Sequence, residues 1–314
     1  MSNLKHWLGV VLALQLTLAA AFLWGQRADD GDTAQQPLLN FTAANVDKIV
    51  IQEDELTTTL LRENGIWQLP ELEKVPASEN EVQRLLEKLQ ALRTGWPVAT
   101  TSSSHSRFQV AEDENQRRIA LYQGDTLAAE LLVGSSPGFR KVHLRRPGED
   151  AVYTGELPTH ELPAKPERWL NQDLIAAGDV SAIQGEGYTL EKQGEQWQFA
   201  DGEAQVAADK AKTLVDAIAK LKVTGVASEV PAQAASTALQ VKADGKPWTY
   251  TFLKKDGNHY VQRDDQSVTF TLAPHIYQRI ADTDRAALTA PQAETETETQ
   301  AKTEMDSEAD KDAS

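Results

Sequence analysis

Three short segments of the sequence contain residue types that serve as nucleophiles, bases or metal ligands in enzymes. Residues 134–138, GSSPG, match the G-x-S-x-G pattern around a serine nucleophile, and residues 102–105 place three serines before a histidine. His160 begins the sequence HELPAKPE, which starts like a zinc-binding H-E-x-x-H motif. The chemistry to test for is therefore acyl transfer and zinc-dependent hydrolysis.

None of the three patterns is complete. Pro137 directly follows the central serine and has no backbone N–H to donate to an oxyanion. The segment at His160 lacks the second histidine of a zinc site, and the serines before His105 are typical of a polar linker. We therefore expect no catalytic, metal-binding or cofactor-binding residues and no cofactor, and we predict that the protein is not an enzyme.

The composition excludes further classes of site. The 314-residue chain has no cysteine, which rules out disulfides, thiolate metal sites and cysteine nucleophiles. Its formal net charge of −16 argues against nucleic acid as a partner, because phosphate binding needs a clustered positive surface. The sequence contains no G-x-x-x-x-G-K-[ST] pattern, so we expect no nucleotide hydrolysis by a P-loop.

One basic cluster stands out in this acidic chain. The segment RKVHLRR contains Arg140, Lys141, His143, Arg145 and Arg146. Alternate residues of a strand share a face, so Lys141, His143 and Arg145 are expected on one side. This strip is the candidate docking surface for an acidic partner, a lipid headgroup or a sugar acid. The alternative is a solvated face or a charged edge strand that discourages aggregation.

The N-terminal residues predict a membrane segment. Lys5 precedes an uncharged, mostly apolar run from Trp7 to Trp24, which as a helix would rise about 27 Å, close to the thickness of a bilayer core. We predict an anchor over residues 1–27 and a linker over 28–45, with the rest of the chain outside the cytoplasm. The alternative is a signal peptide cleaved after the small residues Ala19 and Ala21, which would release the protein.

Two segments of the chain repeat one another. Trp67 and Trp197 each follow a turn between apolar stretches, and the Asn-Gly of the first turn is a strong hairpin signal. Each hairpin precedes an apolar stripe at helical spacing, within residues 82–92 and 214–221. Ser78 with Glu81 forms a capping-box pattern before the first helix. We expect both tryptophans to be structural landmarks, packed between sheet and helix and shielded from water.

Alternating strands and turns follow each helix, so each repeat is expected to contain two strands, one helix and then about four strands. The predicted fold class is α+β: two tandem repeats of an antiparallel sheet with one packed helix. The repeats are assigned to residues 46–162 and 180–284, joined by a linker over 163–179. The second is expected to be shorter, mainly between its helix and its later strands. The acidic residues 285–314 are predicted to form a disordered tail.

This layout resembles the bacterial domain of unknown function 4340 family. The residues that carry the resemblance are the strand and turn before Trp67, the helix at 78–93, RFQVAED at 107–113, and RWLNQDLIAAGDVSAI at 168–183. The resemblance implies an envelope protein with an N-terminal membrane segment, encoded beside ABC-type transporter or gliding-motility-like components. It implies no catalytic residues.

These observations support three functional expectations. The first is a non-enzymatic, membrane-tethered accessory protein in the bacterial cytoplasmic membrane, auxiliary to an ABC-type transport or surface-assembly system. The second is an exported binding protein with a ligand site between the two repeats, since clefts between domains are common binding sites. The third is an envelope hydrolase, whose carboxylates cannot be picked out among 47 acidic residues.

Overall fold

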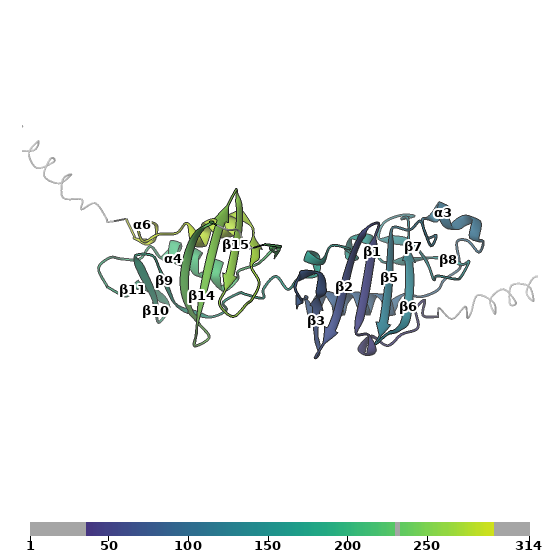
Figure 1. Cartoon of the computed structure of the whole chain (residues 1–314), viewed down its shortest axis with the longest axis horizontal. Coiled ribbons are helices and arrows are strands. Elements are labelled where there is room, and N and C mark those ends of the chain that lie inside the picture. Colours follow the sequence, from purple (N-terminus) through teal and green to yellow (C-terminus); the bar gives the residue numbers. More distant parts are fainter. Residues whose placement is uncertain (1–35, 230–232, 292–314) are drawn as a thin grey trace, which may run out of the picture. The chain divides into compact units, whose positions relative to one another are not determined.

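The computed structural model describes residues 36–229 and 233–291 and divides into two compact units (Figure 1). The first unit ends at Asn171 and the second begins at Gln172, a division that falls inside the predicted linker. They are called the first and second repeat below. The predicted N-terminal membrane helix lies outside the described residues. Within these residues, no helix has the length and apolar character needed to cross a membrane.

The first repeat is one antiparallel sheet with a helix on one face. Its strands lie in the order β4-β3-β2-β1-β5-β6-β7-β8. The strands and helices are β1 (Lys48–Glu53), β2 (Leu56–Glu63), β3 (Ile66–Leu69), β4 (Val75–Pro76), α2 (Glu79–Ala91), α3 (His105–Phe108), β5 (Arg117–Gln123), β6 (Thr126–Val133), β7 (Lys141–Arg145) and β8 (Val152–Glu156).

The second repeat is a second antiparallel sheet, ordered β11-β10-β9-β13-β14-β15-β16-β12. Its strands and helices are β9 (Val180–Gly185), β10 (Tyr188–Gln193), β11 (Gln196–Phe199), α4 (Ala208–Ala219), β12 (Gly225–Val226), β13 (Ala235–Ala243), β14 (Lys246–Lys255), β15 (Asn258–Arg263), β16 (Phe270–Leu272), α5 (Pro274–Ala281) and α6 (Arg285–Leu288).

The two repeats share one chain path. In each, the first strand is central: β1 pairs with β2 and β5, and β9 pairs with β10 and β13. The chain builds one half of the sheet, crosses back through a helix and builds the other half. The stretch between the helix and the strand that joins the central strand runs from Leu92 to Gln116 before β5. Before β13 it runs only from Lys220 to Ala234 and includes the short strand β12, which confirms the predicted shortening.

The expectation of two strands before each helix was wrong, because the central strands β1 and β9 were missed. The turn after β1 is Asp54-Glu55, with Asp54 in the left-handed region at φ 50°. It contains neither glycine nor proline, so it lacked the usual signal of a turn. The Asn64-Gly65 turn was predicted correctly: both residues have positive φ, at 52° and 84°, as this hairpin type requires.

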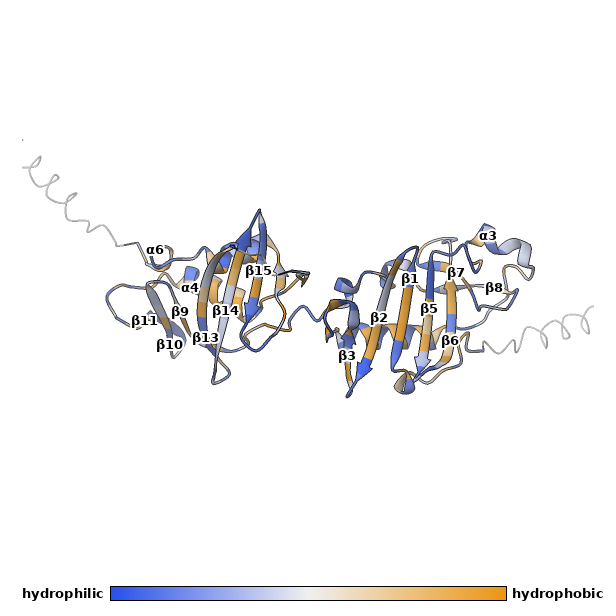
Figure 2. Cartoon of the chain, in the orientation of Figure 1, coloured by the Kyte–Doolittle hydropathy of each residue, from blue (hydrophilic) through white to orange (hydrophobic). Residues whose placement is uncertain are grey.

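Each helix buries its predicted apolar stripe against its sheet, whose central strands carry most of the hydrophobic residues (Figure 2). In α2 the buried residues are Val82, Leu85, Leu86 and Leu89. The capping box does not form, although Ser78 is the N-cap. In such a box the carboxylate of Glu81 would accept a hydrogen bond from the backbone N–H of Ser78. That N–H instead donates to the carbonyl of Trp169 at 2.7 Å.

The long connection in the first repeat folds over the opposite face of the sheet. Val110, in this connection, packs with Leu132 and Val152 in a small core that also contacts Phe108. Strand β7 is therefore covered on both faces, and only its first residue, Lys141, is exposed. The prediction that His143 would lie on an exposed strip was wrong, since the residues predicted to be a mere connection cover it.

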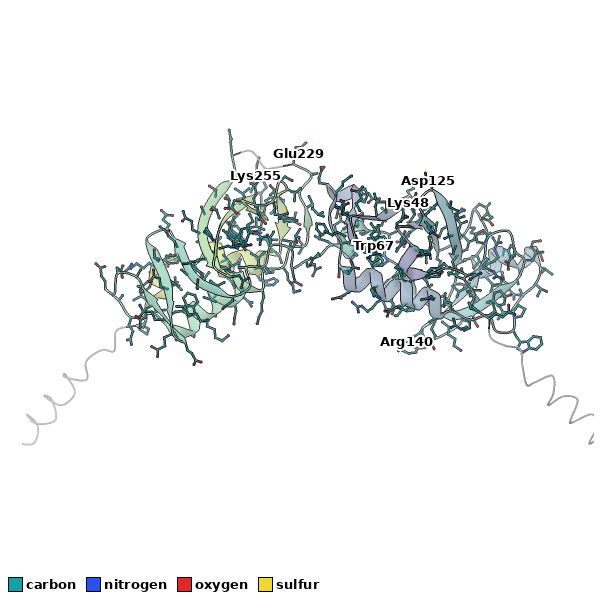
Figure 3. The ribbon with its side chains drawn as sticks, turned by 90° about the horizontal axis from the view of Figure 1, so that it is seen from below. Lys48, Trp67, Asp125, Arg140, Glu229 and Lys255 are labelled. Carbon is teal, nitrogen blue, oxygen red and sulfur yellow. The ribbon has the colours of Figure 1, made fainter. Side chains whose placement is uncertain are left out.

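The two tryptophans differ in burial. Trp67 is 2% exposed, and its strand β3 contacts α2, as expected (Figure 3). Trp197 in β11 is only half-buried, so the prediction that it is shielded from water was wrong for the second repeat. The difference arises at the sheet edge, because β4 covers the outer side of β3 whereas β11 is itself the edge strand.

The second repeat extends beyond its predicted end. It carries two helices in addition to α4, namely α5 and α6, so the expectation of one helix per repeat was too simple. Thr289 forms a bridge with Val206 and belongs to the fold. The predicted tail therefore begins too early at residue 285, and residues 292–314 lie outside the described residues.

Trp67→Ala should destabilise the first repeat strongly. Removing a buried tryptophan side chain leaves a large cavity, and we expect a loss of about 3–5 kcal/mol in the free energy of unfolding. The matched variant Trp197→Ala should cost the second repeat clearly less, because its ring is already partly in water. Urea unfolding of the full chain, followed by circular dichroism, measures both. Equal losses would contradict this difference in packing.

His143 should make the first repeat less stable in acid. Burial lowers the pKa of its imidazole, opposed by a hydrogen bond involving Ser135, and the positive charge of Arg107 lowers it further. The folded state then binds fewer protons than the unfolded state, so stability falls as pH drops below the ordinary histidine value of about 6.5. Unfolding free energies between pH 7.5 and pH 5 should show this loss.

The loss should shrink in His143→Asn, whose side-chain amide can still hydrogen-bond with the hydroxyl of Ser135. The exposed His160 provides the control, since His160→Asn should leave the pH dependence as it is. A wild-type and a His143→Asn protein with the same pH dependence would show that this ring does not cause it.

Candidate functional site

The predicted basic strip does not form one surface. Arg140 and Lys141 are exposed, Arg146 is half-buried, and Arg145 and His143 are 3% and 7% exposed. Figure 3 shows Arg140 at the periphery of the first repeat. The burial of the two central residues removes the continuous charged face that the alternation in β7 predicted, so the five residues do not form one continuous strip.

The buried members of the cluster hold the first repeat together. Arg145 donates from Nε to the carbonyl of Val110 at 2.6 Å, and its other nitrogens reach the carbonyl of Glu149 and the carboxylate of Glu112. His143 lies 3.1 Å from the hydroxyl of Ser135 through Nδ1. These contacts fasten the long connection onto the sheet, and we assign both side chains a structural role.

The serine and histidine segments also have structural partners. The hydroxyl of Ser136 lies 2.7 Å from the carbonyls of both Gly138 and Lys141, can donate to either, and so closes a turn. A side chain at Gly134 would meet the carbonyl oxygen of Phe108 at 2.1 Å, so tight packing explains this glycine. His105 is buried, with Nε2 3.1 Å from the carbonyl of Asp150.

No group of three or more histidine, aspartate or glutamate side chains within residues 36–229 and 233–291 is arranged to hold a metal ion. The acidic residues with lowered pKa values lie in ion pairs. Arg285 lowers the pKa of the Asp201 carboxyl, and Arg263 lowers that of Asp265. Each carboxylate is thus engaged by a cation rather than presented to a substrate.

Sequence reasoning missed two exposed aromatic residues of the first repeat. Phe139 is 90% exposed and Trp96 is 82% exposed. Arg93 and Arg140 line one surface hollow of about 470 Å³, and the guanidinium of Arg140 lies 5.7 Å from the ring of Phe139. Because single exposed aromatics leave no mark in a hydrophobic pattern, only the folded structure shows that they and these arginines are on the surface.

The first described residues meet the fold beside Arg93, one of these two arginines. The backbone N–H of Thr94 donates to the carbonyl of Gln36 at 2.8 Å, and Pro37 bridges Arg93. Trp96 follows two residues after Thr94. The chain therefore enters the first repeat beside an exposed tryptophan and an arginine, a combination suited to polar and aromatic contacts with a surface.

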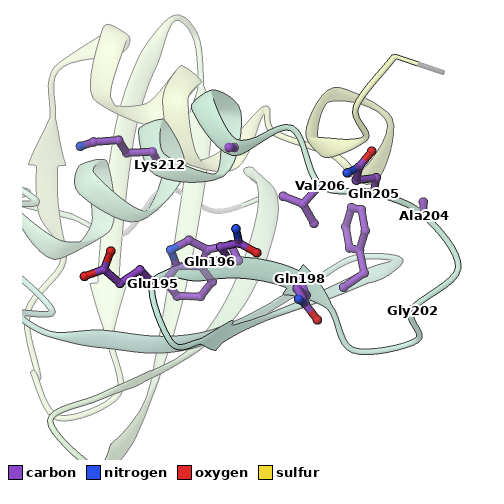
Figure 4. Close-up of a pocket in the computed structure, with 11 residues that line it drawn as sticks. Glu195, Gln196, Gln198, Gly202, Ala204, Gln205, Val206 and Lys212 are labelled. Carbon is purple, nitrogen blue, oxygen red and sulfur yellow. The ribbon is translucent and has the colours of Figure 1, made fainter. Parts of the chain in front are cut away.

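A cavity with a volume of about 630 Å³ lies in the second repeat. One wall is β11 with the turn residue before it, and the other is the segment that leads into α4 (Figure 4). Gln196 and Gln198 project from the strand, while Gln205 and Val206 lie opposite, and Lys212 comes from α4. This cavity is called the β11 groove below.

The β11 groove can bind but offers little for catalysis. Its lining combines amide side chains with the half-buried ring of Trp197 and the ring of Phe199. Its two charged residues are Glu195 and Lys212, and Lys212 is paired with Asp216. Amide groups, aromatic rings and an exposed strand edge favour recognition of a polypeptide over a reaction.

The comparisons with known proteins agree with the resemblance noted in the sequence. The family described as domain of unknown function (DUF4340) matches residues 67–247, from the tryptophan of β3 through β13 to the second residue of β14. No curated protein and no solved structure matches the chain. Since the match spans more than half of the sequence, including the helix of each repeat, the chain belongs to the DUF4340 family.

Proposed function

We propose that the protein is a non-enzymatic accessory protein of the bacterial envelope, tethered to the cytoplasmic membrane by residues 1–27. Both repeats lie outside the cytoplasm and serve an ABC-type transport or surface-assembly system. The proposal is supported by the apolar N-terminal run and by the resemblance described above. Its alternative, an exported binding protein with a ligand between the repeats, stays a prediction.

The observation that carries the proposal is the surface beside the entry point of the chain. Trp96, Phe139 and Arg140 are exposed in the first repeat, and Trp96 follows two residues after Thr94, which fixes Gln36 to the fold. Aromatic and cationic side chains favour the interface of a membrane, where rings contact the headgroup region and arginines contact lipid phosphates. This end of the first repeat is therefore well suited to lie near the bilayer that the N-terminal segment would enter.

Cysteine labelling tests the predicted topology. Because the chain has no cysteine, a single one can be introduced by Ile66→Cys at a side chain that is 52% exposed. A membrane-impermeant maleimide added to spheroplasts should label Ile66→Cys, whereas the matched variant Asn3→Cys should react only after lysis. Labelling of Ile66→Cys only after lysis would place the repeats in the cytoplasm and contradict the proposal.

The mass of the membrane-extracted protein separates an anchor from a cleaved signal peptide. An intact N-terminus is expected. Co-purification of transporter subunits with the detergent-solubilised full chain tests the accessory role, and recovery of the chain alone under several detergents would contradict it.

A further inference from the structure

The outer edges of the two sheets differ in one respect. In the first repeat, β4 is hydrogen-bonded on both of its sides. On the inner side, Val75 and Pro76 pair with β3, and the N–H of Ala77 donates to the carbonyl of Trp67 at 2.8 Å. On the outer side, Ser78 donates to Trp169, and Asn171 donates to the carbonyl of Pro76 at 3.0 Å.

In the second repeat, the segment that corresponds to β4 has the hydrogen bonds on its outer side but not those to the neighbouring strand, β11. Ala207 donates to the carbonyl of Leu288, and Ala290 donates to the carbonyl of Gln205, both at 2.8 Å. These bonds match those of Ser78 and Asn171 in direction and position. Among the residues that the structure describes, however, no strand pairs with the outer edge of β11. Residues 205–207 are hydrogen-bonded to residues 288–290 and not to β11, whose outer edge is therefore uncovered.

Backbone groups on both walls of the β11 groove therefore face it without partners among residues 36–229 and 233–291. Carbonyl and N–H groups of successive residues in an extended chain point to opposite sides. Since Gln205 and Ala207 bond outward, the backbone groups of Val206 point inward. On β11, Trp197 occupies the place of Trp67, as the matching pairs Arg62–Trp67 and Lys192–Trp197 show. Its carbonyl corresponds to the one that accepts from Ala77.

Side-chain burial gives an independent sign of the same gap. Val75 and Ala77 are 5% and 6% exposed, and they help to bury Trp67. Their counterparts Ala204 and Val206 are only half-buried, as is Trp197. The second repeat thus lacks the apolar side chains that would complete its edge in the manner of the first.

We propose that the β11 groove binds an extended segment of a partner protein, which adds as a strand between β11 and residues 205–207. Main-chain hydrogen bonds to Trp197 and Val206 hold the segment, and small apolar residues at alternate positions cover the ring of Trp197. The first repeat shows the chemistry of the occupant, because Val75-Pro76-Ala77 fills the equivalent place there. The inference goes beyond the accessory role and holds whether or not residues 1–27 anchor the chain.

A fluorescent peptide with the sequence of residues 71–79, ELEKVPASE, is the probe. Fluorescence anisotropy with the full chain in detergent should show saturable binding. Val206→Pro removes an N–H that points into the groove, and we expect binding about three- to tenfold weaker. The matched control Gln205→Pro copies Pro76 and removes an N–H that points away from the groove, so its affinity should stay within about twofold. Absent or non-saturable binding, or equal effects of the two prolines, would overturn the proposal.

If Val206→Pro does not fold, hydrogen exchange on the wild-type chain tests the same proposal without a variant. The amides of Trp197 and Val206 should exchange more slowly when the peptide is present, and those of β3 should not change. Slowing elsewhere only would place the peptide at another site and overturn the proposal.

Two other occupants give distinct results. If deletion of residues 292–314 strengthens peptide binding at least fivefold, the chain's own tail fills the groove. If sedimentation shows a dimer that the peptide dissociates, a second copy fills it. Either result would overturn the assignment to a partner protein.

Discussion

The packing of one helix across one sheet is the interaction on which the rest of each repeat depends. The central strand β1 obtains its two neighbours, β2 and β5, from chain segments that lie on either side of α2 in the sequence. The two halves of the sheet can join only if the chain returns over the face of the sheet, and the buried stripe of α2 makes that return favourable. The same path in the second repeat places β11 at one edge and the residues before α4 beside it. The β11 groove is thus a direct consequence of where the returning helix begins.

The two repeats show how one path can give a closed or an open edge. In the second repeat, the loop between β11 and α4 is held from the C-terminal side: Arg285 pairs with Asp201 at 2.5 Å, and its guanidinium lies 4.7 Å from the ring of Phe199. Asp284 caps the short helix that carries this arginine. These contacts hold the end of β11 and the start of this loop against α6. An edge strand without a partner is usually protected by charge, proline or twist, because it would otherwise pair with other chains. The β11 strand, Gln-Trp-Gln-Phe, contains neither a charged residue nor a proline.

Local signals in the sequence were enough for the hairpins that end in Trp67 and Trp197 and for the helices α2 and α4. The Asn64-Gly65 turn and the apolar stripe of α2 depend on neighbouring residues, so the architecture of tandem α+β repeats could be predicted. The central strand β1 was missed because its turn contains no glycine. The burial of His143 and Arg145 depends on a connection that folds back from a distant part of the chain, which alternation within β7 cannot reveal. The groove was invisible for a stronger reason, since it is defined by a pairing that one repeat makes and the other does not. In the structure, the half-exposure of Trp197, compared with the burial of Trp67, is one sign of the groove.

The nature of such a site explains why no side-chain motif in the sequence marks it. A strand edge recognises its partner through backbone N–H and carbonyl groups, which every residue except proline supplies in full. Side chains contribute only small pockets at alternate positions, and residues such as Gln198 and Val206 carry no motif. Catalytic and metal sites, by contrast, require particular side chains at particular spacings. A protein that works by strand addition therefore needs none of the side-chain patterns by which enzymes are recognised. Its binding site is found by comparing two sheet edges that are nearly equivalent. In this chain the duplication supplies both edges, so the closed first repeat shows what the open second repeat is shaped to receive.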